Sequence, residues 1–265
     1  MSAKRVSITE MGVWQRCHLQ WHYQYRLRLK SKTAVLNPYM LSGSAVHFGI
    51  EAGLLLGPQA AEDAAVTYLK AEVGDKGERY VKGVSHALKG IPEWAWRVAS
   101  PQSEMKLTIE VGQVTIVGKP DLWWVDDDGL HVVEFKSTSK NPSEKLREYE
   151  RWNQQPWRYA VLLRAFLPGL RDIQTGVKHV VLSTNEESVE GEEIPCTPAR
   201  LRLVEETMVQ LAQEVGIEPI VGVFEPFICE GCNFADLDEV LLTGGDWRDK
   251  IAREFVERER KQAVS

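Results

Sequence analysis

The chain has 265 residues, of which 43% are hydrophobic and 26% charged, and its formal net charge at pH 7 is −6. This ordinary globular composition suffices for one large domain or two small ones, and the negative charge argues against a general nucleic-acid coat protein. No apolar run reaches the roughly 18 residues of a membrane helix. The N-terminal residues lack the apolar region of a signal peptide, so we expect a cytoplasmic protein with no membrane partner. Four cysteines fit a reducing compartment and are too few for a disulfide framework.

Helical and strand patterns follow one another along the chain. Ser7, with Glu10 three residues later, predicts a capped helix start. The middle of the chain is rich in β-branched residues and alternates as strands do, and helical spacing returns toward the C-terminus. The expected helices span 7–30, 44–56, 58–73, 78–99 with a break at Pro92, 144–167, 198–216 and 246–262, and the expected strands span 104–111, 113–125, 130–136 and 176–183.

This order predicts a single domain of the α/β class over residues 1–265. Residues 1–100 form a mainly helical N-terminal part, residues 101–185 contain the β-sheet core, and residues 186–265 form a helical C-terminal part with a CxxC motif. The chain contains no internal repeat, low-complexity tract or linker that would divide it.

Residues 118–140 place charged side chains inside two apolar runs joined by the turn sequence DDDG. Because side chains alternate along a strand, Glu134 and Lys136 share one face, and a hairpin brings Asp121 nearly level with Glu134. Two carboxylates at that distance repel each other unless a cation neutralises them, and Mg²⁺ prefers such oxygen ligands. The hairpin therefore predicts either a divalent-metal site or a solvated salt-bridge cluster on an exposed sheet face.

The motif that spans this hairpin resembles that of a known family. Gly118 and Asp121, followed by Glu134, Phe135 and Lys136, are similar to the core motif of the PD-(D/E)XK nuclease superfamily, particularly its RecB-like exonuclease branch. The resemblance implies a restriction-endonuclease-like core, a short mixed β-sheet flanked by helices, with an N-terminal helical region. It also implies that Asp121, Glu134 and the carbonyl of Phe135 bind Mg²⁺ or Mn²⁺ while Lys136 positions the attacking water.

Two further motifs of that branch occur in the expected chain order. Gly43 and His47 resemble its Gly-x-x-x-His helix, whose histidine reaches the active-site metal. Gln155 and Tyr159 resemble its Gln-x-x-x-Tyr motif, which contacts the site and the DNA. Pro156 departs from that motif, because a proline kinks a helix or begins one.

The cysteines match part of an iron–sulfur pattern known in the CRISPR-adaptation and AddB-type relatives. There, one cysteine of the opening helix joins three near the C-terminus; here Cys17, Cys229 and Cys232 are present, but Asp238 occupies the fourth position. Three alternatives stay open. They are a [4Fe–4S] cluster with a non-cysteine fourth ligand, zinc with three cysteines and a further ligand, or no metal.

The resemblance implies a Mg²⁺- or Mn²⁺-dependent deoxyribonuclease, an exonuclease in preference to an endonuclease, acting in recombination, repair or phage DNA processing. The alternative is a non-catalytic DNA-end-binding or assembly subunit with the same fold. Expected partners are single-stranded DNA or duplex ends, a second copy of the chain, and recombination or CRISPR proteins. A basic run in the N-terminal region could meet backbone phosphates; its members are Arg26, Arg28, Lys30 and Lys32.

Overall fold

The computed structural model describes residues 4–31, 38–74, 78–98, 101–103, 105–170, 172–217, 234 and 247–257. They belong to two compact units, of which the first comprises residues 1–5 with 36–209 and the second residues 6–35 with 210–265. The single-domain assignment stays a prediction. Within the described residues, no helix is both long and apolar enough to cross a membrane.

The second unit begins with the predicted capping box. The Oγ of Ser7 accepts a hydrogen bond from the Glu10 backbone N–H at 3.0 Å, and Glu10 in turn accepts one from the Ser7 N–H at 3.3 Å. The predicted helix 7–30 is interrupted, however, because Cys17 has an extended backbone and its Sγ caps the next turn. The resulting elements are α1 (Ile8–Arg16), α2 (His18–Trp21), the π-helical turn η1 (His22–Arg26) and β2 (Leu29–Ser31).

A small sheet closes this unit. Strand β10 (Phe255–Glu257) pairs antiparallel with β2 and follows α12 (Trp247–Glu254). The predicted helix 246–262 is therefore wrong from residue 255 onward, up to the last described residue. The reason is tertiary: the buried Phe255 packs in an aromatic cluster with Phe234 and Tyr23, which overrides a weak helical preference.

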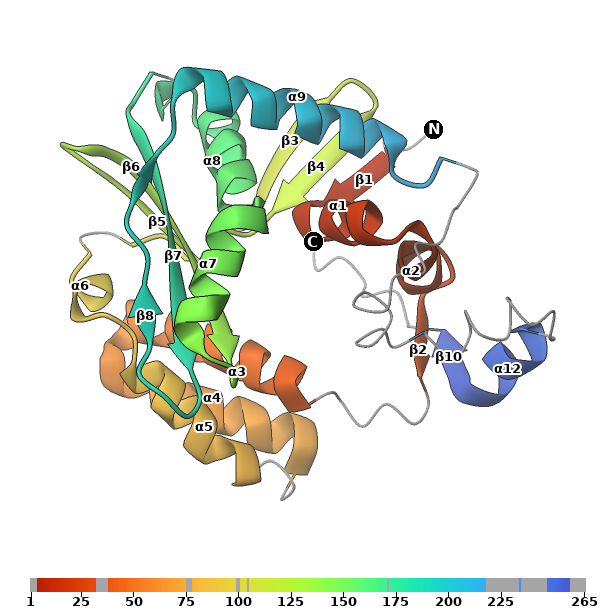
Figure 1. Cartoon of the computed structure of the whole chain (residues 1–265), viewed down its shortest axis with the longest axis horizontal. Coiled ribbons are helices and arrows are strands. Elements are labelled where there is room, and N and C mark those ends of the chain that lie inside the picture. Colours follow the sequence, from red (N-terminus) through yellow and green to blue (C-terminus); the bar gives the residue numbers. More distant parts are fainter. Residues whose placement is uncertain are drawn as a thin grey trace. The chain divides into compact units, whose positions relative to one another are not determined.

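The first unit opens with four helices (Figure 1). They are α3 (Pro38–Leu56), α4 (Pro58–Val73), α5 (Glu78–Lys89) and α6 (Glu93–Trp96). Helices α3 and α4 pack closely because two residues of α3 lack a side chain: a Cβ at Gly49 would lie 2.7 Å from the Ala61 carbonyl oxygen, and one at Gly53 would lie 2.9 Å from the Ala61 Cβ. Their apolar faces share a core with Phe135, Val180 and Leu182 of the sheet.

Two sheets complete the first unit. Strands β3 (Leu107–Val111) and β4 (Val114–Gly118) pair antiparallel, and β1 (Lys4–Ser7) joins β4. The second sheet has the order β5-β6-β7-β8, with β9 also on β7. Its strands are β5 (Leu122–Asp126), β6 (Gly129–Thr138), β7 (Thr175–Ser183), β8 (Val189–Glu190) and β9 (Ile194–Pro195). The predicted strand 113–125 is two strands, broken next to Pro120, which has no N–H to donate to a ladder.

The parallel pairing of β6 with β7 requires a crossover, which two helices supply. They are α7 (Pro142–Trp152) and α8 (Gln155–Phe166), followed by the short η3 (Pro168–Leu170) and, after the sheet, by α9 (Pro198–Glu214). The predicted helix 144–167 is interrupted at residues 153–154, because Pro156 begins a new helix within its first turn. Antiparallel β5–β6 and parallel β6–β7 pairs, flanked by helices, confirm the predicted α/β class with a short mixed sheet.

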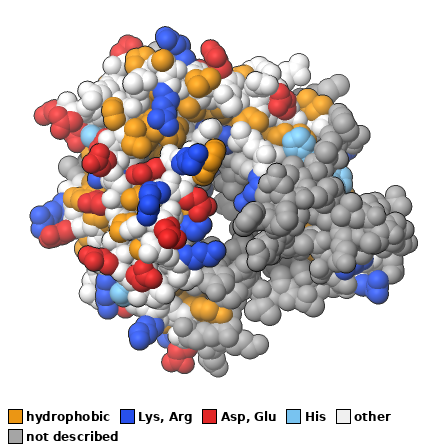
Figure 2. All heavy atoms as spheres, in the orientation of Figure 1, with side chains coloured by type: hydrophobic (Ala, Val, Ile, Leu, Met, Phe, Trp, Pro, Cys, Tyr) orange, Lys and Arg blue, Asp and Glu red, His pale blue; other side chains and the backbone are white. Residues whose placement is uncertain are grey.

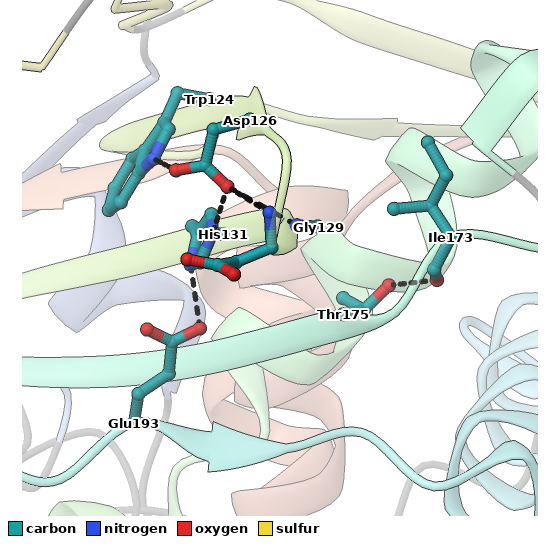
Figure 3. Close-up of polar contacts among 8 residues, drawn as sticks. Trp124, Asp126, Gly129, His131, Ile173, Thr175 and Glu193 are labelled. Carbon is teal, nitrogen blue, oxygen red and sulfur yellow. Dashed lines mark hydrogen bonds and ion pairs between the residues drawn. The ribbon is translucent and has the colours of Figure 1, made fainter.

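The tip of the β5–β6 hairpin is held by a polar cluster (Figure 3). The Nε2 of His131 lies 2.9 Å from Asp126 Oδ1, and its Nδ1 lies 2.7 Å from Glu193 Oε1. The ring of Trp124 stacks on His131 with centroids 4.6 Å apart, and its Nε1–H donates to Asp126. These contacts fasten one end of the hairpin and so maintain the register at its other end.

Substitution of Gly129 is expected to destabilise this hairpin strongly. Gly129 has φ 139°, and a Cβ there would lie 2.2 Å from the carbonyl oxygen of Gln174. We expect Gly129→Ala to lower the free energy of unfolding by about 3 kcal/mol, because backbone strain and a backbone clash add. Gly112→Ala is the matched control: its φ is also positive, at 60°, but no atom lies within 4 Å. It should cost only about 1 kcal/mol. If denaturant titrations showed that the two variants lose the same free energy of unfolding, the proposed backbone clash at Gly129 would be contradicted.

Candidate active site

The hairpin register brings the two carboxylates together. Leu122 pairs with Val133, so Asp121 and Glu134 occupy the next position of the same ladder. Asp121 lies just before β5, where its Oδ2 accepts a hydrogen bond from the Phe135 N–H at 2.8 Å. Phe135 points into the helix-covered core. Glu134 and Lys136 therefore project to the opposite face, as alternation along a strand requires.

A lysine and a glutamine continue this cluster. The Nζ of Lys136 donates to Glu134 Oε1 in a close ion pair and to Gln155 Oε1 at 3.2 Å. The Nε2 of Gln155 then donates to the Tyr159 hydroxyl at 2.8 Å. Because Pro156 starts α8 next to it, Gln155 stands in the first turn and faces Lys136. The proline thus lets the helix begin at the predicted glutamine.

A histidine reaches the cluster from the helical layer. The Nδ1 of His47, on α3, lies 3.1 Å from Asp121 Oδ1. Gly43, one turn earlier on α3, lies beside the sheet, where a Cβ would approach Ser137 Oγ at 3.3 Å. The structure thus brings His47, Asp121, Glu134, Lys136, Gln155 and Tyr159 into one network, and their roles stay predictions.

Burial distinguishes this network from a surface ion-pair cluster. Glu134 is fully buried and Asp121 is 7% exposed. Surface ion pairs contribute little and tolerate solvent, whereas buried charges need partners on every side. The alternative of a solvated cluster on an exposed sheet face does not fit these side chains.

The pKa values of the two carboxylates shift in opposite directions. Burial raises the pKa of Asp121, but the charge and hydrogen bond of His47 outweigh it and hold that pKa below its usual value. Burial, together with the Asp121 charge, raises the pKa of Glu134 to about 7. Burial lowers the pKa of Lys136, but the charges of Glu134 and Asp121 more than compensate and keep it above its usual value. The site is a desolvated group of charges in which Glu134 is the least satisfied.

A divalent cation fits this donor set. The Oε2 of Glu134 is buried and has no hydrogen-bond partner among the described residues, and unpaired buried oxygens are costly. Two carboxylates beside a backbone carbonyl are the oxygen donors that Mg²⁺ and Mn²⁺ prefer. No group of three or more His, Cys, Asp or Glu side chains within the described ranges is arranged to hold a metal as it stands. His47 and Lys136 contact the two carboxylates in this structure.

The other predicted site residues lie in the second unit. Cys17 is buried, and its Sγ accepts a hydrogen bond from the Gln20 N–H at 3.4 Å. Cys229, Cys232 and Asp238 fall outside the described residues. The iron–sulfur, zinc and no-metal alternatives all stay predictions.

The predicted DNA-binding run is partly described. Arg26 is exposed, Arg28 is half-buried with φ 55°, and Lys30 belongs to β2. Lys32 falls outside the described residues. On the described surface that faces the viewer in Figure 2, acidic and basic side chains are intermingled. The role of the run stays a prediction.

One histidine beside the network was not predicted. His179 of β7 is level with Glu134 in the parallel β6–β7 ladder and is 1% exposed. The signal that identifies the hairpin, a polar side chain inside an apolar run, is also present in GVKHVVLS. The sequence does not show that this histidine lies beside Glu134, because that depends on the register between two strands that are distant in sequence.

The His47–Asp121 pair predicts a pH-dependent contribution to stability. Asp121 raises the pKa of His47 from 6.5 to about 9. The folded state therefore holds this proton more tightly, and the stabilisation is fully present below pH 6.5 and is lost as pH rises through 9. We expect His47→Gln to lower the free energy of unfolding of the metal-free protein below pH 6.5 and to change it little above pH 9. Denaturant titrations across this range measure it, and a pH-independent difference would contradict the pairing.

Comparisons with known proteins concern the chain as a whole. A model of the PD-(D/E)XK nuclease superfamily matches residues 5–237. A solved protein of Eubacterium rectale, assigned by inference as an exonuclease, is 14% identical with a TM-score of 0.53, over 99% of this chain and 91% of its own. The protein SSO0001 is 16% identical with a TM-score of 0.47, over 89% of this chain and 86% of its own. At 14% identity the likeness to the Eubacterium rectale protein concerns the fold alone. No curated protein sequence matches the chain.

Proposed function

Because the chain belongs to the PD-(D/E)XK nuclease superfamily, we propose that it is a metal-dependent DNA exonuclease of the RecB-like branch. The observation that carries this proposal is the buried network of Asp121, Glu134 and Lys136, completed by His47 and Gln155. The arrangement of His47 on α3 and of the Gln155–Tyr159 pair on α8 supports the RecB-like branch in particular. The inferred exonuclease assignment of the Eubacterium rectale protein is consistent with the mode of cleavage.

Each side chain has a distinct task in phosphodiester hydrolysis. Asp121 and Glu134, with the Phe135 carbonyl, would hold Mg²⁺ or Mn²⁺, which supplies Lewis-acid chemistry by activating water and offsetting charge on the phosphate. The Lys136 ammonium orients the attacking water and stabilises the negative charge that develops on the phosphate. His47 fixes the Asp121 carboxylate at 3.1 Å.

Two side chains on α8 support the lysine. Gln155 holds the Lys136 ammonium at 3.2 Å, and Tyr159 holds the Gln155 amide at 2.8 Å. A lysine fixed by both a carboxylate and an amide loses little freedom when the phosphate arrives, and this preorganisation is the usual source of such catalysis.

The second candidate is a non-catalytic subunit that binds DNA ends. It is favoured by one observation: within the described ranges, no ready-made group of three ligating side chains is present. Cleavage of DNA distinguishes the two candidates directly.

The test uses end-labelled single-stranded DNA, duplex DNA and RNA of one sequence, each incubated with the full chain and Mg²⁺, Mn²⁺ or EDTA. We expect mononucleotides or short oligonucleotides to be released from DNA ends only with the divalent ion. A circular single-stranded DNA of the same length separates exonuclease from endonuclease action. A protein that retains DNA but releases no nucleotide with either ion would be the non-catalytic subunit, and the nuclease proposal would be wrong.

A further inference from the structure

His179 and Glu134 occupy one buried layer of the first unit. Residues that are level in a parallel ladder project to the same face, and their side chains are neighbours. His179 on β7 is level with Glu134 on β6, and the two are 1% and 0% exposed. Helix α8, which supplies Gln155 to Lys136, packs on both strands.

These neighbours have complementary unsatisfied atoms. Neither ring nitrogen of His179 has a hydrogen-bond partner among the described residues, and neither has Glu134 Oε2. Val177 and Val181, which share this face of β7, are apolar and buried, and an imidazole beside them is costly unless its polar atoms are paired. A valine or leucine would fill this position without that cost, so simple packing does not account for the histidine.

The ring of His179 can supply a donor to this layer. The neutral ring carries one N–H donor and one acceptor nitrogen. A carboxylate oxygen that lacks a donor is the natural partner for that N–H through one buried water.

We propose that His179 is a positioning residue for Glu134, its ring N–H donating to Glu134 Oε2 through one buried water. Glu134 is then held at both oxygens, since Lys136 already donates to Oε1. Each carboxylate oxygen keeps a lone pair for a cation. His179 does not touch the substrate; it fixes the orientation of a carboxylate that would. The expected effect on kcat rests on the proposed function, whereas the contact between His179 and Glu134 does not depend on that function.

Three variants test the consequence. His179→Leu keeps the volume and removes the donor, His179→Gln keeps an N–H donor, and Val177→Ala alters a buried residue of the same strand that carries no polar group. Calorimetric titration with Mn²⁺ in the absence of DNA measures affinity, and steady-state kinetics separates kcat from KM. We expect His179→Leu to weaken Mn²⁺ binding and lower kcat, each by about tenfold to a hundredfold. KM for DNA should be unchanged, His179→Gln should recover most of both losses, and Val177→Ala should resemble the wild type.

The contact between His179 and Glu134 can also be measured without substituting His179. Nitrogen-15 NMR of the metal-free protein should show one ring N–H of His179 protected from exchange with solvent, and Glu134→Gln should shift it. An unprotected ring N–H that ignores Glu134→Gln would overturn the inference, as would a folded His179→Leu protein with wild-type Mn²⁺ affinity and kcat. A wild-type protein that neither binds Mn²⁺ nor cleaves DNA would instead refute the proposed function, while the NMR result would still decide the contact.

Discussion

Lys136→Met is expected to lower kcat for DNA cleavage by about a thousandfold or more while the protein stays folded. The ammonium that donates to Glu134 and Gln155 is lost, and with it the positive charge that stabilises the phosphate and orients water. The remaining carboxylates can adjust, because Glu134 already has a pKa of about 7 through burial and the Asp121 charge. It can therefore take up a proton when the lysine is absent.

The matched control is Lys145→Met. Lys145 also forms an ion pair, with Glu148 one turn later on α7, but its partner carboxylate is exposed, whereas that of Lys136 is buried. Surface pairs of this kind contribute little, so kcat should stay within about twofold of wild type. Circular dichroism and thermal unfolding confirm the fold of both variants. A Lys136→Met protein that is folded and retains a tenth or more of wild-type kcat would contradict the role given to the lysine.

Glu134→Gln is expected to abolish metal-dependent cleavage and yet stabilise the metal-free protein at neutral and alkaline pH. The carboxylate is fully buried, and burial together with Asp121 raises its pKa from 4.5 to about 7. Its proton is therefore held more tightly in the folded state, so stability is fully present below pH 4.5 and is lost as pH rises through 7. The amide carries no charge and removes this loss, and the stabilising effect should vanish at acid pH.

Denaturant titrations of the two proteins on either side of this range measure the effect, and Mg²⁺ should stabilise only the wild type. A glutamine that destabilises the protein equally at every pH would show that Glu134 serves the fold instead of a metal. A variant that is more stable but inactive is expected where two carboxylates that repel each other are kept close together for function.

The local features of the fold were predictable where short-range chemistry decides them. The Ser7–Glu10 capping box, the Pro58–Val73 helix and the hairpin that sets Asp121 level with Glu134 all depend on neighbouring residues. The breaks in predicted elements also have local causes, such as the extended Cys17. The strand that begins at Phe255 does not, because the aromatic residues that bury it come from distant parts of the chain.

In the candidate site, too, local patterns predict some residues, and contacts between distant segments bring in the others. Alternation and hairpin pairing place Asp121, Glu134 and Lys136 together from the sequence alone. Neither places His47, which reaches Asp121 from α3, and family resemblance was needed to include it. His179 was missed because a parallel crossover pairs β6 with β7, and no local pattern reports the register across that crossover.

The central claim is that Asp121 and Glu134 hold a divalent ion beside Lys136. Anomalous diffraction from crystals of the full chain soaked in Mn²⁺ tests it most directly. The account predicts a peak within about 2.0–2.2 Å of an Asp121 carboxylate oxygen and of a Glu134 carboxylate oxygen, and its disappearance in Glu134→Gln crystals. A saturating soak that leaves no peak between these carboxylates, or places it elsewhere in the wild-type protein, would contradict the account.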